Sequence, residues 1–350
     1  MSVAASAPGK LVLVGEYAVL AGAPALVMAA DRRARVRLTP AAETSCQVHS
    51  RGGASGTARY LFEGGEWTTG DGASLPLVDA ILNELAAELD LVHAPAFSAE
   101  LDTSAFMEAA ADDSRHKLGL GSSAALTVAF ASALAEYTGR LSGRTDRWIG
   151  RLIAVHRRFQ GGRGSGLDIA ASLSGGVISY RMNGAVENPA VSLRPLPDSF
   201  RLLCIWSGRP ASTDAALRRL ERWRGDEPRA YSRALSELAE IAVAADRAAL
   251  ARDAGALLEA VAAYGGSLRR FGAASGIEIY GPGHDRLATL AHEHGAVYKP
   301  CGAGGGDVGI ACSDDPAALD ALRVSIGDAG FRALALAIDP VGLQVQPSLE

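Results

Sequence analysis

The stretch Lys117-Leu118-Gly119-Leu120-Gly121-Ser122-Ser123-Ala124-Ala125 leads directly into an alanine-rich segment with helical spacing. We expect a helix over 122–137 that begins at the serine pair, a residue type suited to capping, and ends at Thr138-Gly139. The first turn of a helix carries unpaired N–H groups and a partial positive charge, which favours phosphate. The stretch therefore indicates a phosphate-binding loop; the alternative is a glycine turn before an ordinary capped helix.

Two common nucleotide-binding motifs do not explain this loop. Gly119-x-Gly121-x-x-Ala124 formally fits the dinucleotide fingerprint G-x-G-x-x-G/A, but that fingerprint must follow an apolar strand. The preceding residues, 111–117, are mostly polar, so a Rossmann dehydrogenase is disfavoured. The pattern G-x-x-x-x-G-K-[ST] is absent from the sequence, so an enzyme that uses ATP here is not a P-loop protein.

Two further glycine clusters each end in a carboxylate. The segment 161–168 ends in Asp168, which is placed either to orient or deprotonate a phosphate acceptor or to cap a helical turn at 169–173. The segment 299–307 ends in Asp307, and its glycines indicate either close packing against another loop or ligand, or a tight hairpin turn. These alternatives stay open on the local pattern alone.

The periodicity of apolar residues predicts a mixed α+β chain. Strands are expected at 9–14, 25–28, 33–38, 177–180, 201–206, 296–298, 308–311 and 343–346. Helices are expected at 76–89, 122–137, 146–159 and 316–327, with a long helical region at 213–272. A polar, proline-containing stretch at 188–199 is typical of a linker, so we expect two domains, 1–195 and 196–350.

Composition narrows the class of protein. The 350 residues carry a net charge of −5 without a long run of one sign, which disfavours nucleic acid as a partner. The sequence has no run of 18 apolar residues, and residues 1–7 do not resemble a signal peptide, so we expect a cytoplasmic protein without membrane partners. The four cysteines lack C-x-x-C spacing, which is typical of free thiols.

Lysine is rare in this chain. Among the 34 lysines and arginines, only Lys10, Lys117 and Lys299 are lysine, and each lies in or beside a glycine-rich segment. A compact ammonium fits where a planar guanidinium fork does not. We interpret Lys10 as such a functional position and leave the other two open.

Together, three segments resemble the three motifs of the GHMP kinases. They are 7–20 (Ala-Pro-Gly-Lys-Leu through Gly-Glu-Tyr-Ala-Val-Leu), 117–125 and 299–309, in the family's order across nearly the whole chain. The resemblance implies an α+β, two-lobed fold with a ribosomal S5 domain 2-like N-terminal lobe and a ferredoxin-like C-terminal lobe. It also implies phosphoryl transfer from ATP with Mg²⁺, by a monomer or homodimer.

Details within the family indicate the acceptor. Gly15-Glu16-Tyr17, the segment 154–171 and the segment 206–213 resemble phosphomevalonate kinases. Mevalonate kinases usually have His at position 17 and a Mg²⁺-binding Glu eleven residues before the catalytic Asp, where this chain has Arg157. The resemblance implies conversion of 5-phosphomevalonate to 5-diphosphomevalonate in isoprenoid biosynthesis. Alternatives are mevalonate or another small alcohol as acceptor, and a non-catalytic sensor that binds nucleotide and metabolite.

The resemblance also implies roles for individual residues. Asp168 would be the catalytic carboxylate, and Lys10 would hold the charge that develops during transfer. Residues for the ATP phosphates would be Lys117, Gly119, Leu120, Gly121, Ser122, Ser123 and Ala124, with Ser122 and Ser123 also near Mg²⁺. Residues on the acceptor side would be Glu16, Ser165, Ser212, Thr213, Gly304 and Gly305. Because phosphomevalonate is strongly anionic, cations for its pocket are sought in Arg163, Arg209, His116 and Lys117.

Overall fold

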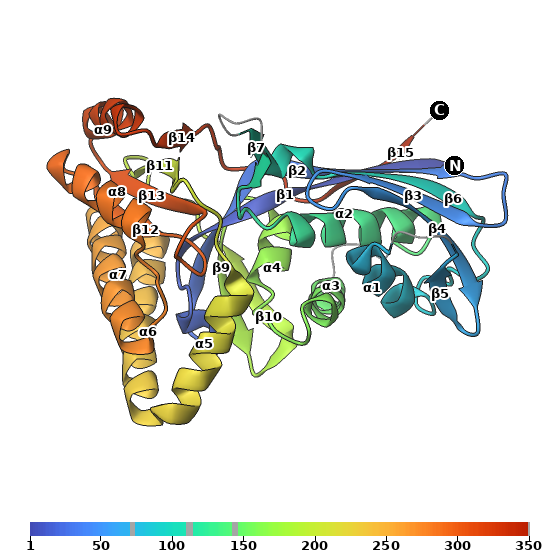
Figure 1. Ribbon diagram of the computed structural model, residues 1–350, viewed down its shortest axis with the longest axis horizontal. Helices are drawn as coiled ribbons and strands as arrows, with labels where there is room; N and C mark the ends of the chain where they lie inside the picture. Colours follow the sequence, from blue (N-terminus) through green and yellow to red (C-terminus); the bar gives the residue numbers. More distant parts are fainter. Residues whose placement is uncertain (71–73, 110–114, 142–145, 349–350) are drawn as a thin grey trace.

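A computed structural model gives the fold of the chain, and the description covers residues 1–350 except 71–73, 110–114, 142–145 and 349–350. Two lobes lie side by side, one built mainly from the first half of the chain and one from the second (Figure 1). One continuous apolar core runs through both lobes, and a smaller core lies on the other face of the C-terminal sheet.

The N-terminal lobe is a large sheet with helices on one face (Figure 1). Its strands are β1 (Ser2–Val14), β2 (Ala25–Pro40), β3 (Cys46–Arg51), β4 (Gly56–Glu63), β5 (Glu66–Thr69), β6 (Phe97–Asp102), β9 (Val177–Asn183), β10 (Ala185–Leu193) and β15 (Gln344–Ser348). They run in the order β10-β9-β2-β6-β3-β4-β5, and β1 pairs with both β2 and β15. The helices are α1 (Pro76–Leu85), α2 (Ser122–Tyr137), α3 (Asp146–Phe159) and α4 (Leu167–Ser174).

Helix α2 is the central element of this lobe. Nearly every residue from Ser122 to Ala135 is buried, because the helix packs on β1 and β2 on one side and on the other helices elsewhere. A helix that is apolar all round belongs in a core. Its many alanines let the helix backbone lie close to the sheet, and this packing fixes the position of the helix N-terminus relative to the sheet. Short 3₁₀ turns, η1 (Ala18–Ala21) and η2 (Ser104–Phe106), and the hairpin of β7 (Met107–Ala109) and β8 (Arg115–Lys117) complete the lobe.

The C-terminal lobe is a four-stranded antiparallel sheet in the order β12-β13-β11-β14, packed with helices. The strands are β11 (Arg201–Trp206), β12 (Val297–Pro300), β13 (Val308–Ser313) and β14 (Arg332–Leu334). The helices are α5 (Thr213–Asp226), α6 (Pro228–Ala251), α7 (Ala254–Ser275), α8 (Pro282–Glu293) and α9 (Pro316–Asp328). The long helix α6 also contacts η1 and β2, so it joins the lobes.

The structure corrects the sequence prediction in several places. The first half of the expected linker at 188–199 belongs to strand β10, an edge strand where Pro189 is tolerated because an edge position needs no further N–H donor. Its second half, 194–199, is irregular and connects β10 to β11. The strands expected at 25–28 and 33–38 form one strand, β2. Strands β3 to β6, between β2 and α2, were not predicted. The bounds predicted for α2, α3 and β11 are confirmed.

The last segment of the chain packs in the N-terminal lobe. After β14 it runs back to the first lobe, where β15 pairs with β1 from Ser2↔Ser348 to Ser6↔Gln344. Asp339 on this returning segment forms an ion pair with Arg33 of β2. The two chain ends therefore lie beside each other (Figure 1). The division at 195 stays a prediction, and the last segment falls outside it in space.

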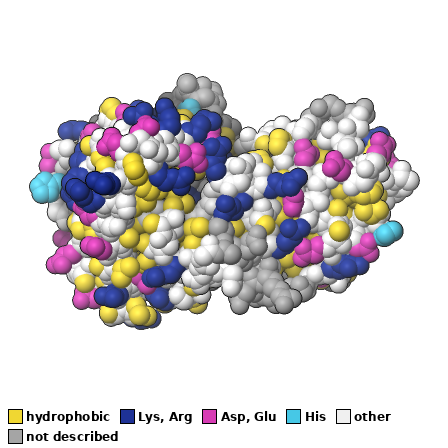
Figure 2. All heavy atoms as spheres, turned by 90° about the horizontal axis from the view of Figure 1, so that it is seen from below, with side chains coloured by type: hydrophobic (Ala, Val, Ile, Leu, Met, Phe, Trp, Pro, Cys, Tyr) yellow, Lys and Arg dark blue, Asp and Glu magenta, His cyan; other side chains and the backbone are white. Residues whose placement is uncertain are grey.

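The distribution of charged side chains, the state of the cysteines and the hydropathy of the helices can be compared with the expectations from composition. On the face shown in Figure 2, acidic and basic side chains are interspersed over the C-terminal lobe. All four cysteines are buried and free. Among the described residues, every helix is too short or too polar to cross a lipid bilayer.

A fully buried ion pair connects the lobes. Lys299 Nζ on β12 lies 2.5 Å from Glu16 Oε1, at the turn after β1, and the two side chains are 0% and 2% exposed. The hydroxyl of Tyr264 donates to the carbonyl of Glu16 at 2.5 Å. A buried charge is tolerated only when it is paired, so the pair fixes how the lobes meet.

We predict that Lys299→Met lowers the free energy of unfolding by about 3–5 kcal/mol, because it leaves the carboxylate of Glu16 buried and uncompensated. Denaturant unfolding measures the change. The matched control is Arg59→Met, which removes a solvent-exposed ion pair with Glu43 and should cost less than about 1 kcal/mol. Equal effects of the two substitutions would show that the buried pair does not hold the lobes together.

Candidate active site

The segment 7–20, the first of the three that resemble family motifs, contacts the loop that precedes α2. The N–H of Lys10 on β1 donates to the carbonyl of Leu120 at 2.8 Å, and Lys10 Nζ lies 3.5 Å from the carbonyl oxygen of Gly119. A Cβ on Gly9 would lie 2.6 Å from the carbonyl oxygen of Leu120, so only glycine permits this approach. The ammonium of Lys10 is thereby held beside the loop before α2.

The start of α2 differs from the prediction at one point. The helix begins at Ser122, its N-cap is Gly121 in the left-handed region (φ 77°), and no side chain caps it. The expectation that the serine pair caps the helix is wrong, because Ser122 and Ser123 are its first two helical residues. The hydroxyls of these serines therefore do not accept hydrogen bonds from the N–H groups of the first turn. N–H groups without such a partner attract an anion.

The glycine-rich segment 299–307 forms a hairpin loop and also packs closely against the loop before α2. It joins the antiparallel strands β12 and β13, and its last residue, Asp307, lies against Gly119. A Cβ on Gly119 would lie 2.2 Å from Asp307 Oδ2. The N–H of Asp307 donates to the carbonyl of Arg209 at 2.7 Å, and Asp307 Oδ1 accepts from the N–H of Ala211 at 3.1 Å. Asp307 thus links the loop before α2 to the segment after β11.

Two lysines and Asp307 form the electrostatic centre of this region. Burial lowers the pKa of Lys117, the carboxylate of Asp307 counteracts this, and the charge of Lys10 adds to the lowering. Burial raises the pKa of Asp307, while the N–H of Ala211 and both lysines work in the opposite direction. A group of partly desolvated cations beside a helix N-terminus can bind a multiply charged anion such as a polyphosphate.

Asp168 faces the same region from α4. The N-cap of its helix is Gly166, which has φ 82° and no room for a Cβ, because that Cβ would lie 2.8 Å from the side chain of Ile153 of α3. Asp168 Oδ1 accepts from the N–H of Ile169 at 2.9 Å, and Oδ2 lies 3.7 Å from Nδ1 of His156 on α3. The Asp168 side chain is 19% exposed, so its carboxylate remains accessible to a small molecule.

His156 connects Asp168 to the first turn of α2. Its Nε2 lies 3.1 Å from Ser123 Oγ, and the residue is 1% exposed. Burial lowers the pKa of His156, which the nearby Asp168 only partly counteracts, so the imidazole is neutral near pH 7. His156 was not predicted as a site residue, although it continues the buried stripe of α3 formed by Ile149, Leu152 and Ile153. A polar residue on such a stripe is the signal that was available.

The predicted acceptor residues separate into two groups. Ser212, Gly304 and Gly305 line one cavity of about 550 Å³ together with Arg209 and Arg219. The hydroxyl of Ser212 caps α5 by accepting from Ala215, and Thr213 is the first residue of that helix.

The other three predicted acceptor residues, Thr213, Ser165 and Glu16, do not line this cavity. Ser165 lies in the loop before α4, where its carbonyl accepts from Tyr180 at 2.5 Å. Glu16 does not join the acceptor residues, because its carboxylate is buried against Lys299. Its position assigns it to the lobe junction.

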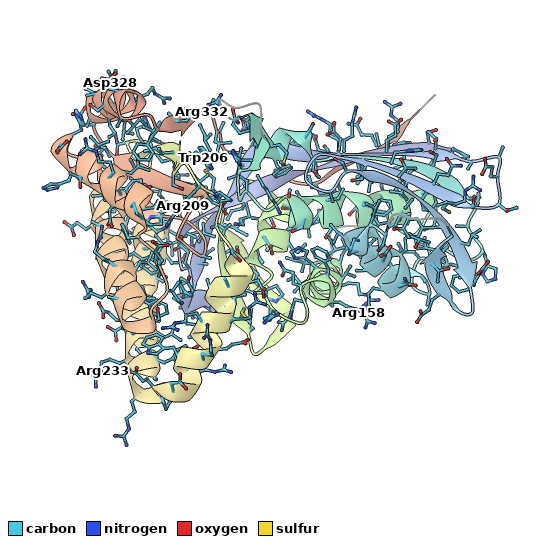
Figure 3. The ribbon with its side chains drawn as sticks, viewed as in Figure 1. Arg158, Trp206, Arg209, Arg233, Asp328 and Arg332 are labelled. Carbon is cyan, nitrogen blue, oxygen red and sulfur yellow. The ribbon has the colours of Figure 1, made fainter. Side chains whose placement is uncertain are left out.

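The predicted cations for the acceptor have diverse partners. Arg163 pairs with Asp214 at 3.3 Å, Arg209 pairs with Glu278 at 2.9 Å, and His116 stacks on Trp206 with ring centroids 5.5 Å apart. Trp206 and Arg209 lie on the side of the C-terminal lobe that faces the N-terminal lobe (Figure 3). Arg157, eleven residues before Asp168, donates to the carbonyl of Gly162 at 2.7 Å and so braces the second glycine loop.

The sequence is similar to those of known kinases. The model of the GHMP kinases N terminal domain matches residues 78–176. The phosphomevalonate kinase of Streptomyces sp. (strain CL190) is 30% identical, with 91% of each chain covered. A mevalonate kinase of Methanothermobacter thermautotrophicus is 34% identical over about half of each chain.

A solved structure has the same fold. Streptococcus pneumoniae phosphomevalonate kinase in complex with phosphomevalonate and AMPPNP has a TM-score of 0.77 and 21% identity, covering 96% of this chain and 99% of that one. The full-length relative, the matching family model and the shared two-lobed fold lead to one conclusion: this chain belongs to the GHMP kinase family and is a phosphotransferase.

Proposed function

We propose that this phosphotransferase moves the γ-phosphate of ATP to 5-phosphomevalonate, giving 5-diphosphomevalonate and ADP in the mevalonate pathway of isoprenoid biosynthesis. The observation that carries the choice of acceptor is the cavity of about 550 Å³ beside the 299–307 loop, which is lined by Arg209 and Arg219. Arg209 pairs with Glu278 of the same lining and Arg219 Nε donates to the carbonyl of Ser275, but a guanidinium has five N–H donors, so both arginines keep donors for an anion. An acceptor with a carboxylate and a phosphate needs such cations, whereas mevalonate carries only the carboxylate. The full-length relative named phosphomevalonate kinase supports the same acceptor.

The residues beside α2 suit the phosphates of ATP. We assign Lys117, Gly119, Leu120, Gly121, Ser122, Ser123 and Ala124 to this role, because they combine a helix N-terminus, glycine backbone and hydroxyls. The ammonium groups of Lys10 and Lys117 would stabilise the charge on the transferred phosphoryl group and the leaving oxygen of ADP. Ser165, Ser212, Thr213, Gly304 and Gly305 remain our candidates for the acceptor side.

The donors near α2 also suit Mg²⁺. Among the described residues, no three His, Cys, Asp or Glu side chains form a metal cluster. Mg²⁺ needs no such cluster, since it is commonly held by one or two carboxylates together with substrate phosphates and water. Asp168 and the hydroxyls of Ser122 and Ser123 fit this pattern. When bound with ATP, Mg²⁺ would neutralise phosphate charge.

Asp168 would act on the acceptor. In the transfer, an oxygen of the acceptor phosphate forms a bond to the γ-phosphorus and the bond to the ADP oxygen breaks. The acceptor phosphate is largely ionised at neutral pH because its second pKa is about 6. Asp168 would therefore orient the acceptor and take up the proton that remains on its monoanionic form.

We predict that ADP release with Mg-ATP is at least about 100-fold more efficient (kcat/KM) with phosphomevalonate than with mevalonate, because a site built for a charged group discriminates strongly against its absence. Arg219→Gln should raise KM for phosphomevalonate by about 10- to 100-fold through loss of a charged contact. Arg222→Gln, an exposed change on the same helix, is the matched control and should have no effect. Turnover of mevalonate alone would overturn the proposed acceptor.

We predict that Asp168→Asn lowers kcat by about 10²- to 10⁴-fold, the range expected for loss of a positioned acid–base group. The dissociation constant for Mg-ATP should change little, since the phosphates are held mainly by the loop before α2. Steady-state kinetics and equilibrium titration measure the two quantities. Unchanged turnover would remove Asp168 from the mechanism.

We predict that Lys10→Met lowers kcat by about 10²- to 10³-fold, comparable to loss of one preorganised donor to a developing charge. Lys10→Arg should not restore activity, because a Cβ on Gly121 would already lie 3.1 Å from Lys10 Cγ and the space is narrow. The same kinetic assay tests both variants. Near-normal turnover of Lys10→Met would contradict the assigned role.

A further inference from the structure

His156 has no role in the function proposed above, yet it contacts a residue on each side of the reaction. Its Nε2 lies 3.1 Å from Ser123 Oγ, a candidate for the ATP side. Its Nδ1 lies 3.7 Å from Asp168 Oδ2, the candidate on the acceptor side. Within the described structure, His156 is thus the side chain that joins these two groups through one rigid ring.

The charge of Asp168 favours the ring tautomer that has its proton on Nδ1. A neutral imidazole has one N–H donor and one acceptor nitrogen, and an ionised carboxylate only accepts. The N–H therefore belongs on Nδ1, facing Asp168. Nε2 then accepts a hydrogen bond from the hydroxyl of Ser123, so that the oxygen lone pairs of Ser123 point away from the ring.

The ring is held by packing on all sides. His156 is 1% exposed on the buried face of α3, and its ring stacks on Phe159 with centroids 6.1 Å apart. A side chain packed in this way keeps its orientation when a substrate binds. The 3.7 Å separation from Asp168 exceeds a hydrogen bond, which is common for catalytic contacts before substrates tighten them.

We propose that His156 is a positioning residue that sets Asp168 through Nδ1 and the Ser123 hydroxyl through Nε2, and so fixes the acceptor carboxylate relative to the ATP phosphates. The proposal rests on the function proposed above, because the two contacts matter as a pair only in phosphoryl transfer. It predicts that the two contacts affect different kinetic constants.

Two amide substitutions separate the contacts. The amide of His156→Asn reaches the place of Nδ1 and not that of Nε2, so it keeps the contact with Asp168 and loses the one with Ser123. The amide of His156→Gln reaches the place of Nε2, so it does the reverse. We expect His156→Asn to raise the dissociation constant for Mg-ATP about tenfold with kcat nearly unchanged. We expect His156→Gln to lower kcat about 10- to 100-fold with Mg-ATP affinity nearly unchanged.

A second histidine supplies the matched control. His294 makes the same Nε2–Ser Oγ contact, with Ser325 at 2.7 Å, between α8 and α9 and away from these loops. His294→Phe should change thermal stability without changing kcat or Mg-ATP affinity. His156→Phe, which loses both contacts, should show both kinetic defects.

The pattern of results decides the proposal. If His156→Asn and His156→Gln lose kcat and Mg-ATP affinity in the same proportion as they lose thermal stability, the role is only structural and the proposal fails. It also fails if neither variant differs from wild type. Mg-ATP titration needs no acceptor, so a wild type that turns over neither phosphomevalonate nor mevalonate would refute the proposed function. An unequal effect of the two amides on Mg-ATP binding would, in that case, still uphold the role of His156.

Discussion

Close backbone approach between three distant segments is the constraint on which this structure depends. Gly9 leaves no room for a side chain beside the carbonyl of Leu120, and Gly119 leaves none beside the carboxylate of Asp307. These contacts bring together β1, the start of α2 and the β12–β13 hairpin, which come from both lobes. Each glycine is needed because it has no side chain. The close contacts that this permits bring charged groups from separate parts of the chain together at one helix N-terminus.

The three lysines have distinct positions in this arrangement. Lys10 and Lys117 lie beside the loop before α2, where partial burial strengthens their interaction with anions. Lys299 is fully buried and pairs with Glu16 across the lobe junction. The two kinds of site are related, because the strand that carries Lys299 leads directly into the loop that ends at Asp307. The ion pair that positions the lobes relative to each other thus also places the carboxylate of Asp307 against Gly119.

The sequence predicted the segments with strong local signals, such as α2, α3, β11 and the three glycine loops. It failed where tertiary pairing decides the structure. Residues 188–193 of β10 were predicted as part of a linker because they are polar and include a proline, and the pairing of β15 with β1 joins residues from opposite ends of the sequence. In the site, the motif residues were found, and the packing of the 299–307 segment against another loop was one of two open alternatives. His156 was missed, because its importance comes from contacts with Ser123 and Asp168. Glu16 was placed with the acceptor because its buried partner, Lys299, is 283 residues away.

The most direct test of the account is a crystal structure of the protein with Mg²⁺, a non-hydrolysable ATP analogue and phosphomevalonate. The account predicts that the nucleotide phosphates lie at the start of α2 beside Lys10 and Lys117, with the acceptor phosphate facing Asp168. It also predicts that an anionic group of the acceptor contacts the arginines of the cavity at α5. Nucleotide phosphates bound away from α2, or an acceptor bound away from Asp168, would contradict the assignment of this region as a phosphoryl-transfer site.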